Sequence, residues 1–121
     1  MTFYTPGQTV EMSGFSLDTL RYYEKIGLLD DVARATSGQR RFSEADLSWL
    51  DMLRCLRDTG MPIAEMLRFK SLTSSDDGTI GERIELLEAH HRAVDERIAH
   101  LQAQQKAIEN KIAYYRSVLD E

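Results

Sequence analysis

Apolar side chains follow a helical period in the stretch that begins after Ser16 and ends before Gly27. Leu17, Leu20 and Tyr23 fall on one face when successive residues are placed about 100° apart on a helical wheel. The hydroxyl of Ser16 suits the N-cap of a helix, and Gly27 suits its end because glycine tolerates the left-handed conformation there. The pattern therefore predicts an amphipathic helix between these two residues.

The outward face of this predicted helix, residues 17–26, is polar and also carries an aromatic ring. It is formed by Asp18, Arg21, Tyr22 and Lys25. Glu24 falls between the two faces of the helix. We expect its carboxylate to be held by a hydrogen bond or by an arginine, because an unpaired half-buried charge is costly.

A shorter helix is predicted just upstream. Thr5 can cap it, Pro6 suits its first helical position because no N–H is needed there, and Gly14 ends it. Two short helices joined by a tight glycine-containing turn, with Arg, Tyr and Lys facing outward from the second, predict a helix-turn-helix. On geometry alone, two helices of any small bundle are the alternative.

Two further helices follow. Ser43 and Asp46 resemble a capping box at the start of a helix that continues to about Thr59 and stops at Gly60. Its predicted apolar side consists of Leu47, Trp49, Leu50, Leu53 and Leu56. Pro62 suits the first position of a fourth, short helix. That helix is expected to bury Ile63, Met66 and Leu67.

The last third of the sequence shows a heptad repeat. A polar stretch at residues 71–78 precedes it, so domains are predicted at residues 1–75 and 79–121, with Thr79 as the cap of a long helix. The seam of the repeat is formed by Ile84, Leu87, His91, Val94, Ile98, Leu101, Gln105, Ile108, Ile112, Tyr115 and Leu119. A helix near 40 residues would be about 60 Å long, too long to bury this seam against a small bundle. A second copy is the simplest partner, which predicts a homodimer.

Polar residues interrupt this seam at His91 and Gln105. Buried polar side chains at such positions commonly fix the register and the number of partners, and we expect that role for both. The histidines, His90, His91 and His100, include no pair at the spacing of three or four residues that places two metal ligands on one helical face. No histidine metal site is predicted.

Basic residues gather between the second and third predicted helices. Arg34, Arg40 and Arg41 lie within residues 32–42, which contain no acidic residue. The turn-forming residues 35–39 favour a short hairpin, or wing. Arginines on a wing beside a recognition helix would contact DNA phosphates without reading the base sequence. A solvated loop is the alternative.

Charge and composition limit these interpretations. The net charge of −5 argues against a nucleic-acid binder, but residues 1–75 carry nine Lys and Arg against ten Asp and Glu, whereas residues 76–121 carry six against ten. No apolar run is long enough to cross a membrane, and the first residues lack a signal pattern. The lone Cys55 cannot form an internal disulfide. We therefore expect a cytoplasmic protein with one small domain and a helical appendage.

Individual residues within these elements point to a family. They are Tyr4-Thr5, Gly14-Phe15-Ser16, Thr19 to Glu24, Gly27-Leu28-Leu29, Arg34, Ser37-Gly38, Arg40-Arg41-Phe42, Asp46 and Gly60-Met61-Pro62. Over about residues 3–72 the sequence closely resembles the MerR family. The resemblance implies a mainly α fold, in which a winged helix-turn-helix DNA-binding domain is followed by a long dimerisation helix that forms an antiparallel coiled coil.

The same resemblance implies a function. Members of this family are homodimeric transcriptional regulators that bind palindromic promoter operators in double-stranded DNA and distort the promoter so that RNA polymerase can use it. Carried over to this sequence, the DNA-binding candidates are Thr19, Arg21, Tyr22 and Lys25 in the recognition helix, with Arg40 and Arg41 in the wing. Phe42 stands where Tyr is more usual and lacks the hydroxyl that could touch a phosphate.

Cys55 is the candidate residue for sensing the signal of such a regulator. Metal-sensing relatives use thiolates near the dimerisation helix, whereas this sequence has no cysteine after Cys55, so no metal or other cofactor is expected. The segment from Leu53 to Met61 resembles a subgroup that responds to aldehydes and thiol-reactive electrophiles through one cysteine. Cys55 lies far from its helix N-terminus, and the nearby Asp51 and Asp58 disfavour the reactive thiolate, so an inert structural cysteine is the alternative.

Other functional classes have less support. No paired carboxylates and no Ser/His/Asp or Cys/His set show a catalytic spacing, so no enzyme is predicted. A coiled-coil protein-interaction adaptor is one alternative, and its DNA affinity would be insensitive to salt and to Arg21. An architectural DNA-bending protein without an inducer is another, which promoter activation in a purified transcription reaction would separate from a sensor.

Overall fold

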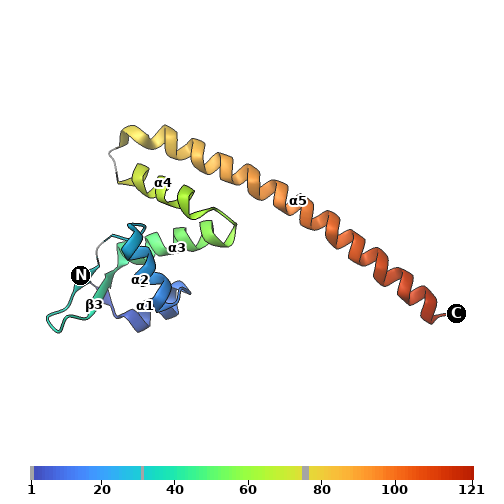
Figure 1. Ribbon diagram of the computed structural model, residues 1–121, viewed down its shortest axis with the longest axis horizontal. Helices are drawn as coiled ribbons and strands as arrows, with labels where there is room; N and C mark the ends of the chain where they lie inside the picture. Colours follow the sequence, from blue (N-terminus) through green and yellow to red (C-terminus); the bar gives the residue numbers. More distant parts are fainter. Residues whose placement is uncertain (1, 31, 75–76) are drawn as a thin grey trace. The chain divides into compact units, whose positions relative to one another are not determined.

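The computed structural model describes residues 2–30, 32–74 and 77–121, and these are mainly helical, as predicted. The helices are α1 (Pro6–Ser13), α2 (Leu17–Ile26), α3 (Glu44–Asp58), α4 (Ile63–Thr73) and α5 (Ile80–Leu119), with a short 3-10 turn η1 (Asp77–Thr79) before α5 (Figure 1). The strands are β1 (Phe3–Tyr4), β2 (Ala33–Arg34) and β3 (Arg40–Ser43).

The helix-turn-helix forms as its end signals predict. The Thr5 hydroxyl accepts the Gln8 backbone N–H while the Gln8 side chain accepts the Thr5 N–H, which closes a capping box at the start of α1. Ser16 caps α2 by accepting the backbone N–H of Thr19. Gly14 and Gly27 end the two helices at φ values of 78° and 86°, where a side chain would be strained.

The predicted wing is an antiparallel hairpin of β2 and β3, and its turn projects from the bundle (Figure 1). It belongs to a three-stranded sheet in the order β1-β3-β2, with Phe3 opposite Ser43 and Tyr4 opposite Phe42. The sequence did not predict β1, because a two-residue strand is too short to show an alternating pattern. This strand anchors the N-terminus against the base of the wing.

The third and fourth helices differ slightly from the prediction. Ser43 and Asp46 form the predicted capping box of α3. Pro62 lies at the N-cap of α4 and not at its first helical position, and α4 extends to Thr73, into the stretch predicted to be a polar linker. Ile63 was expected to be buried but is 36% exposed, because it stands at the very start of the helix, before the chain has turned inward.

The core lies between α1, α2, β3, α3 and α4. Its most deeply buried apolar residues are Phe15, Leu20, Tyr23, Leu28, Leu29, Phe42, Leu50, Leu53, Leu56 and Met66. Phe69, which the sequence did not place in the core, is also buried and stacks on Trp49 with ring centroids 5.7 Å apart. The inward face of the recognition helix, with Leu20 and Tyr23, thus packs into this core, and this leaves its other face in solvent.

The chain forms two compact units, residues 1–83 and residues 84–121. The division therefore falls inside α5, whereas the sequence places the domain boundary between residues 75 and 79; that boundary stays a prediction. Met1, Asp31, Ser75 and Asp76, which lie in or beside the segments predicted from the sequence, are outside the described residues. Thr79 directly precedes α5, and its hydroxyl donates to the backbone carbonyl of Leu72. Among the described residues, no helix is apolar over a length that could span a membrane.

Candidate nucleic-acid interface

The outward face of α2 carries the side chains that the sequence assigned to it. Arg21, Tyr22 and Lys25 are exposed, with Tyr22 half exposed at 50%. Arg21 pairs with Asp18 at 3.9 Å, and both side chains are largely in water, where such a pair contributes little. The Arg21 guanidinium can therefore exchange this contact for a base edge or a phosphate at small cost.

Thr19 has a structural role in addition to its predicted one. Its backbone N–H donates to the Ser16 hydroxyl at 3.1 Å, and its own hydroxyl oxygen accepts from that hydroxyl at 2.9 Å. The hydroxyl proton of Thr19 is not used in these two bonds, and the side chain is half-buried in the first turn of α2. Thr19 can therefore offer a single donor at the N-terminal end of the recognition helix.

The wing presents its arginines on alternate faces, because side chains alternate along a strand. Arg40 pairs in register with Arg34, and Arg41 pairs with Ala33. Arg41 is exposed on one face, with its guanidinium 4.1 Å from the centroid of the Phe3 ring. Arg34 is exposed on the other face and donates to the carbonyl of Gly38 in the turn at 3.1 Å.

Arg40 is turned toward the recognition helix. Its guanidinium donates to both carboxylate oxygens of Glu24, at 3.1 Å and 3.4 Å. The expectation that Glu24 is held by an arginine is therefore confirmed. Whether Arg40 also reaches a phosphate stays a prediction.

An open groove lies between the start of α2 and the wing. It is lined by Pro6, Leu17, Arg21, Arg34, Gly38, Gln39 and Arg40. Three of these residues are arginines, one from α2 and one from each strand of the wing, so their positive charges converge on one surface. The sequence analysis noted Arg34 as part of the basic segment but did not name it as a DNA contact. The alternation of the wing strands was the signal that pairs it with Arg40.

Cys55 lies on α3 and is exposed. Its backbone carbonyl accepts the hydroxyl of Thr59 at 2.7 Å at the C-terminal end of the helix. Arg54 precedes it and donates to the backbone carbonyl of Ser13, next to the turn between α1 and α2. The thiol is thus open to reagents on an element that packs directly on the helix-turn-helix.

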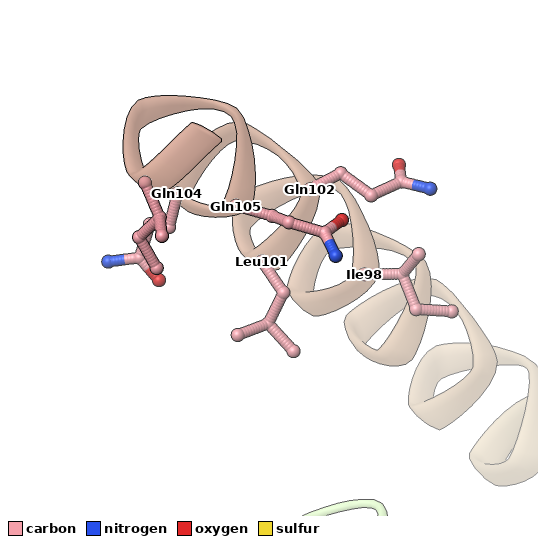
Figure 2. Close-up of a pocket in the computed structure, with 6 residues that line it drawn as sticks. Ile98, Leu101, Gln102, Gln104 and Gln105 are labelled. Atoms are coloured by element: carbon pink, nitrogen blue, oxygen red, sulfur yellow. The ribbon is translucent and has the colours of Figure 1, made fainter. Parts of the chain in front are cut away.

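The heptad seam of α5 is exposed along much of its length. Ile98 and Leu101 are 48% and 57% exposed, and with Ile108 and Gln105 they line an open groove on this helix (Figure 2). Other seam residues with large exposed side chains are Ile84, Ile112, Tyr115 and Leu119. Leu87 and Val94 are half-buried, and His91 makes a contact of 3.4 Å with Asp95. This face is periodic and largely apolar, and residues 98–108 are exposed.

Tyr23 and Asp58 have pKa values shifted from their ordinary ones, and neither is among the predicted DNA contacts. Burial raises the pKa of the Tyr23 hydroxyl above its ordinary value, although the guanidinium of Arg57 acts in the opposite direction. Hydrogen bonds from Arg57 hold the pKa of Asp58 below its ordinary value. Within the described ranges, no three His, Cys, Asp or Glu side chains gather as metal ligands.

A capped recognition helix beside an arginine-bearing wing defines this protein as a winged helix-turn-helix protein. The family model described as MerR HTH family regulatory protein matches residues 4–69, and a second, described as MerR, DNA binding, matches residues 47–111. The chain belongs to the MerR family of helix-turn-helix regulators.

Curated relatives support this assignment. An uncharacterized HTH-type transcriptional regulator of Haemophilus influenzae is 46% identical over 85 residues, which cover 70% of this chain and 63% of the relative. The HTH-type transcriptional regulator AdhR of Bacillus subtilis is 34% identical over 80 residues, which cover 66% of this chain and 57% of AdhR. The matched stretch thus spans less than two thirds of either relative.

Solved structures match over a longer part of the chain. HiNmlR, a MerR family regulator lacking the sensor domain and bound to promoter DNA, has a TM-score of 0.86 at 40% identity, with 96% of this chain and 92% of that one covered. A MerR family transcriptional regulator from Bacillus thuringiensis has a TM-score of 0.82 at 35% identity, with 93% and 98% covered. Both likenesses include the long C-terminal helix, since they cover more than nine tenths of each chain.

Proposed function

We propose that this protein is a sequence-specific DNA-binding transcriptional regulator of the MerR type. The observation that carries the proposal is the outward face of α2, where Arg21 and Tyr22 stand exposed beside a groove that Arg34 and Arg40 also line. An α-helix of this kind fits the major groove, and wing arginines beside it can hold the adjacent phosphates. No enzymatic activity is part of the proposal.

Within this interface we assign two kinds of contact. Arg21, Tyr22, Lys25 and Thr19 face the base edges from α2, and Arg21 has the donor geometry that suits guanine. Arg41 and Arg34 contact phosphates from the wing. Arg40 lies between the two groups and is shared between Glu24 and the groove.

The proposal includes a homodimer. The exposed apolar seam of α5 supports it, because a stripe such as Ile98, Leu101 and Ile108 is unfavourable in water and is satisfied by a second identical helix. Two recognition helices joined by this coil would read a palindromic operator, since the two-fold symmetry of the protein is matched by that of the DNA. The proposal extends to distortion of the promoter and cooperation with RNA polymerase, which the resemblance to the family implies.

For the signal, we propose that an aldehyde or another thiol-reactive electrophile acts through Cys55. The exposure of the thiol and its place on α3 support this choice. The likeness to HiNmlR, described as lacking the sensor domain, is in keeping with a signal that is received within the DNA-binding unit itself. A cytoplasmic location is proposed with it, as befits a protein that acts on promoters.

The experiment that tests the DNA-binding function uses the purified full chain and a pool of random DNA duplexes. Repeated selection should enrich a palindromic sequence, and affinity for it should fall steeply as salt rises because bound phosphates have released their counterions. Arg21→Ala should weaken the enrichment. Affinity that responds neither to salt nor to this substitution would instead identify a protein-interaction adaptor.

A further inference from the structure

Two side chains of the third helix contact the chain just before and just after the recognition helix. At the C-terminal end, the indole N–H of Trp49 donates to the backbone carbonyl of Leu28 at 2.8 Å, one residue beyond the Gly27 that stops α2. At the N-terminal end, the guanidinium of Arg54 donates to the backbone carbonyl of Ser13 at 3.2 Å, in the last residue of α1. Both acceptors are backbone atoms, so the contacts fix the path of the chain and not only a side chain.

The contact between Arg54 and Ser13 depends on the glycine in the turn between α1 and α2. A Cβ atom on Gly14 would overlap the Arg54 guanidinium, so the glycine leaves room for it. The adjacent Arg57 stacks over the Phe15 ring at 4.5 Å. Asp58 lies 3.5 Å from Arg54 and 3.0 Å from Arg57 and so pairs with both guanidinium groups beside the turn.

This contact leads directly into the recognition helix. The buried Phe15 ring meets the ring of Tyr23 edge to face, with centroids 5.3 Å apart and planes 73° apart. Tyr23 is on the inward face of α2, directly after the exposed Tyr22. A change in how Arg54 and Arg57 hold the turn would therefore alter the tilt of α2 on the core.

The contact at the C-terminal end is equally well supported. Trp49 stacks on Phe69 of α4, and the ammonium of Lys70 lies 5.6 Å from the Trp49 ring while forming a 2.8 Å ion pair with Asp30. The indole is thus held on one side by α4 and donates on the other to the residue that leaves α2. Trp49 and Arg54 are five positions apart, a rise of about 7.5 Å along α3, and the two long side chains reach the chain on either side of α2.

We infer that α3 sets the tilt of the recognition helix by holding the chain on both sides of it, at Ser13 and Leu28, and that Trp49 and Arg54 are positioning residues for sequence-specific DNA reading. The inference rests on the proposed DNA-binding function. Precise placement of the reading side chains matters most for base contacts, because hydrogen bonds weaken steeply when their geometry is poor. Phosphate contacts tolerate small displacements, since charge attraction is less directional.

The test compares Arg54→Ala, Trp49→Phe and the control Arg92→Ala, which removes an exposed arginine from α5. Binding is measured on two probes of equal length: a duplex that the wild-type full chain has selected from a random pool, and a scrambled duplex. Arg54→Ala and Trp49→Phe should weaken binding to the selected duplex about tenfold. The affinity for the scrambled duplex should change less than about twofold. Arg92→Ala should leave the affinity for both duplexes unchanged.

A second measurement separates positioning from plain loss of stability. In an Arg21→Ala background, Arg54→Ala should cause little further loss on the selected duplex, because the contact it positions is already absent. Equal losses on both duplexes, a salt slope reduced by Arg54→Ala, or fully additive losses would overturn the inference and leave the DNA-binding function intact. Failure of the wild type to prefer any duplex would instead overturn the proposed function. Trp49→Phe keeps an aromatic ring in the core and provides the same test if Arg54→Ala is poorly folded.

Discussion

The carboxylate of Glu24 in the recognition helix and the guanidinium of Arg40 in the wing are joined by two hydrogen bonds, of 3.1 Å and 3.4 Å. Both side chains are mostly buried, with exposed fractions of 18% and 22%. A partly buried pair of this kind is oriented, since neither group can turn to water without losing its partner. The pair thus joins the wing to the C-terminal turn of α2, and it gives Arg40 a structural role that the exposed Arg41 lacks.

The first prediction follows from this difference. Arg41→Gln should weaken binding to selected and scrambled duplexes alike and reduce the slope of log affinity against log salt by about 0.9, the value for one phosphate contact. Arg40→Gln should weaken mainly the binding to the selected duplex and leave the salt slope unchanged. It should also lower the free energy of unfolding by about 2–3 kcal/mol, because the carboxylate of Glu24 loses its partner. Filter binding over a salt series and urea unfolding measure the two effects.

The control for this prediction is the double variant Glu24→Gln with Arg40→Gln. It should regain part of the lost stability, since no unpaired charge is then left in the half-buried site. If Arg40→Gln reduces the salt slope as much as Arg41→Gln does, Arg40 contacts a phosphate, and its main role is not to join the wing to α2.

The second prediction concerns direct reading of bases by α2. Arg21→Ala and Tyr22→Ala should each weaken binding to the selected duplex by about 1–3 kcal/mol, the usual value of a specific base contact. Stability should change little, because both side chains are exposed. Fluorescence anisotropy on selected and scrambled duplexes measures the loss, and sedimentation checks that the oligomeric state is unchanged. Wild-type affinity in both variants would move the DNA-reading face away from α2.

Most of the fold was predictable because its end signals are local. Ser16, Gly27 and the capping residues of α1 and α3 act within a few residues of themselves, so the bounds of α1 and α2 could be derived from sequence. The strand β1 could not be derived in this way. Its two residues form a strand only by pairing with β3, where Phe3 lies opposite Ser43, 40 residues further along the chain. Ile63 shows the same limit, since periodicity cannot tell where a short helix first meets the core.

The candidate interface was predictable to a similar degree. The helical period alone places Arg21 and Tyr22 outward, and the structure agrees. The pairing of Arg40 with Glu24 and the contacts of Trp49 and Arg54 with backbone carbonyls link residues 16 to 41 positions apart. Such contacts depend on how the helices pack, and no local pattern records them.

The third prediction tests the coil. Leu101→Glu places a charge in the seam, where it would be desolvated on dimerisation, and should shift the protein to a monomer with weak operator affinity because two half-sites are no longer joined. Ala103→Glu is the matched control, since residue 103 is exposed and lies off the predicted seam. Analytical ultracentrifugation gives the mass of each. Equal masses for the two variants would show that this face of α5 is not the dimer interface.

The last prediction concerns the signal and builds on the position of Cys55. The thiol is exposed and follows Arg54, whose guanidinium holds the turn before the recognition helix. An adduct on Cys55 would add bulk beside Arg54 and Thr59, disturb that contact and so change how α2 is presented to the promoter. Formaldehyde or a quinone should therefore alter transcription from the promoter in a purified reaction with the wild-type protein, whereas Cys55→Ser should be unresponsive.

Two controls make this result specific. Cys55→Ser should keep wild-type affinity for the selected duplex when no electrophile is present, because serine is nearly the same size and the site is open to water. Mass spectrometry of the treated wild type should find the adduct on Cys55, the one cysteine in the sequence. Arg54→Ala, already lacking the contact, should show a much smaller response to the electrophile. If wild type and Cys55→Ser respond equally, the thiol is not the sensor and the helix-turn-helix receives its signal elsewhere.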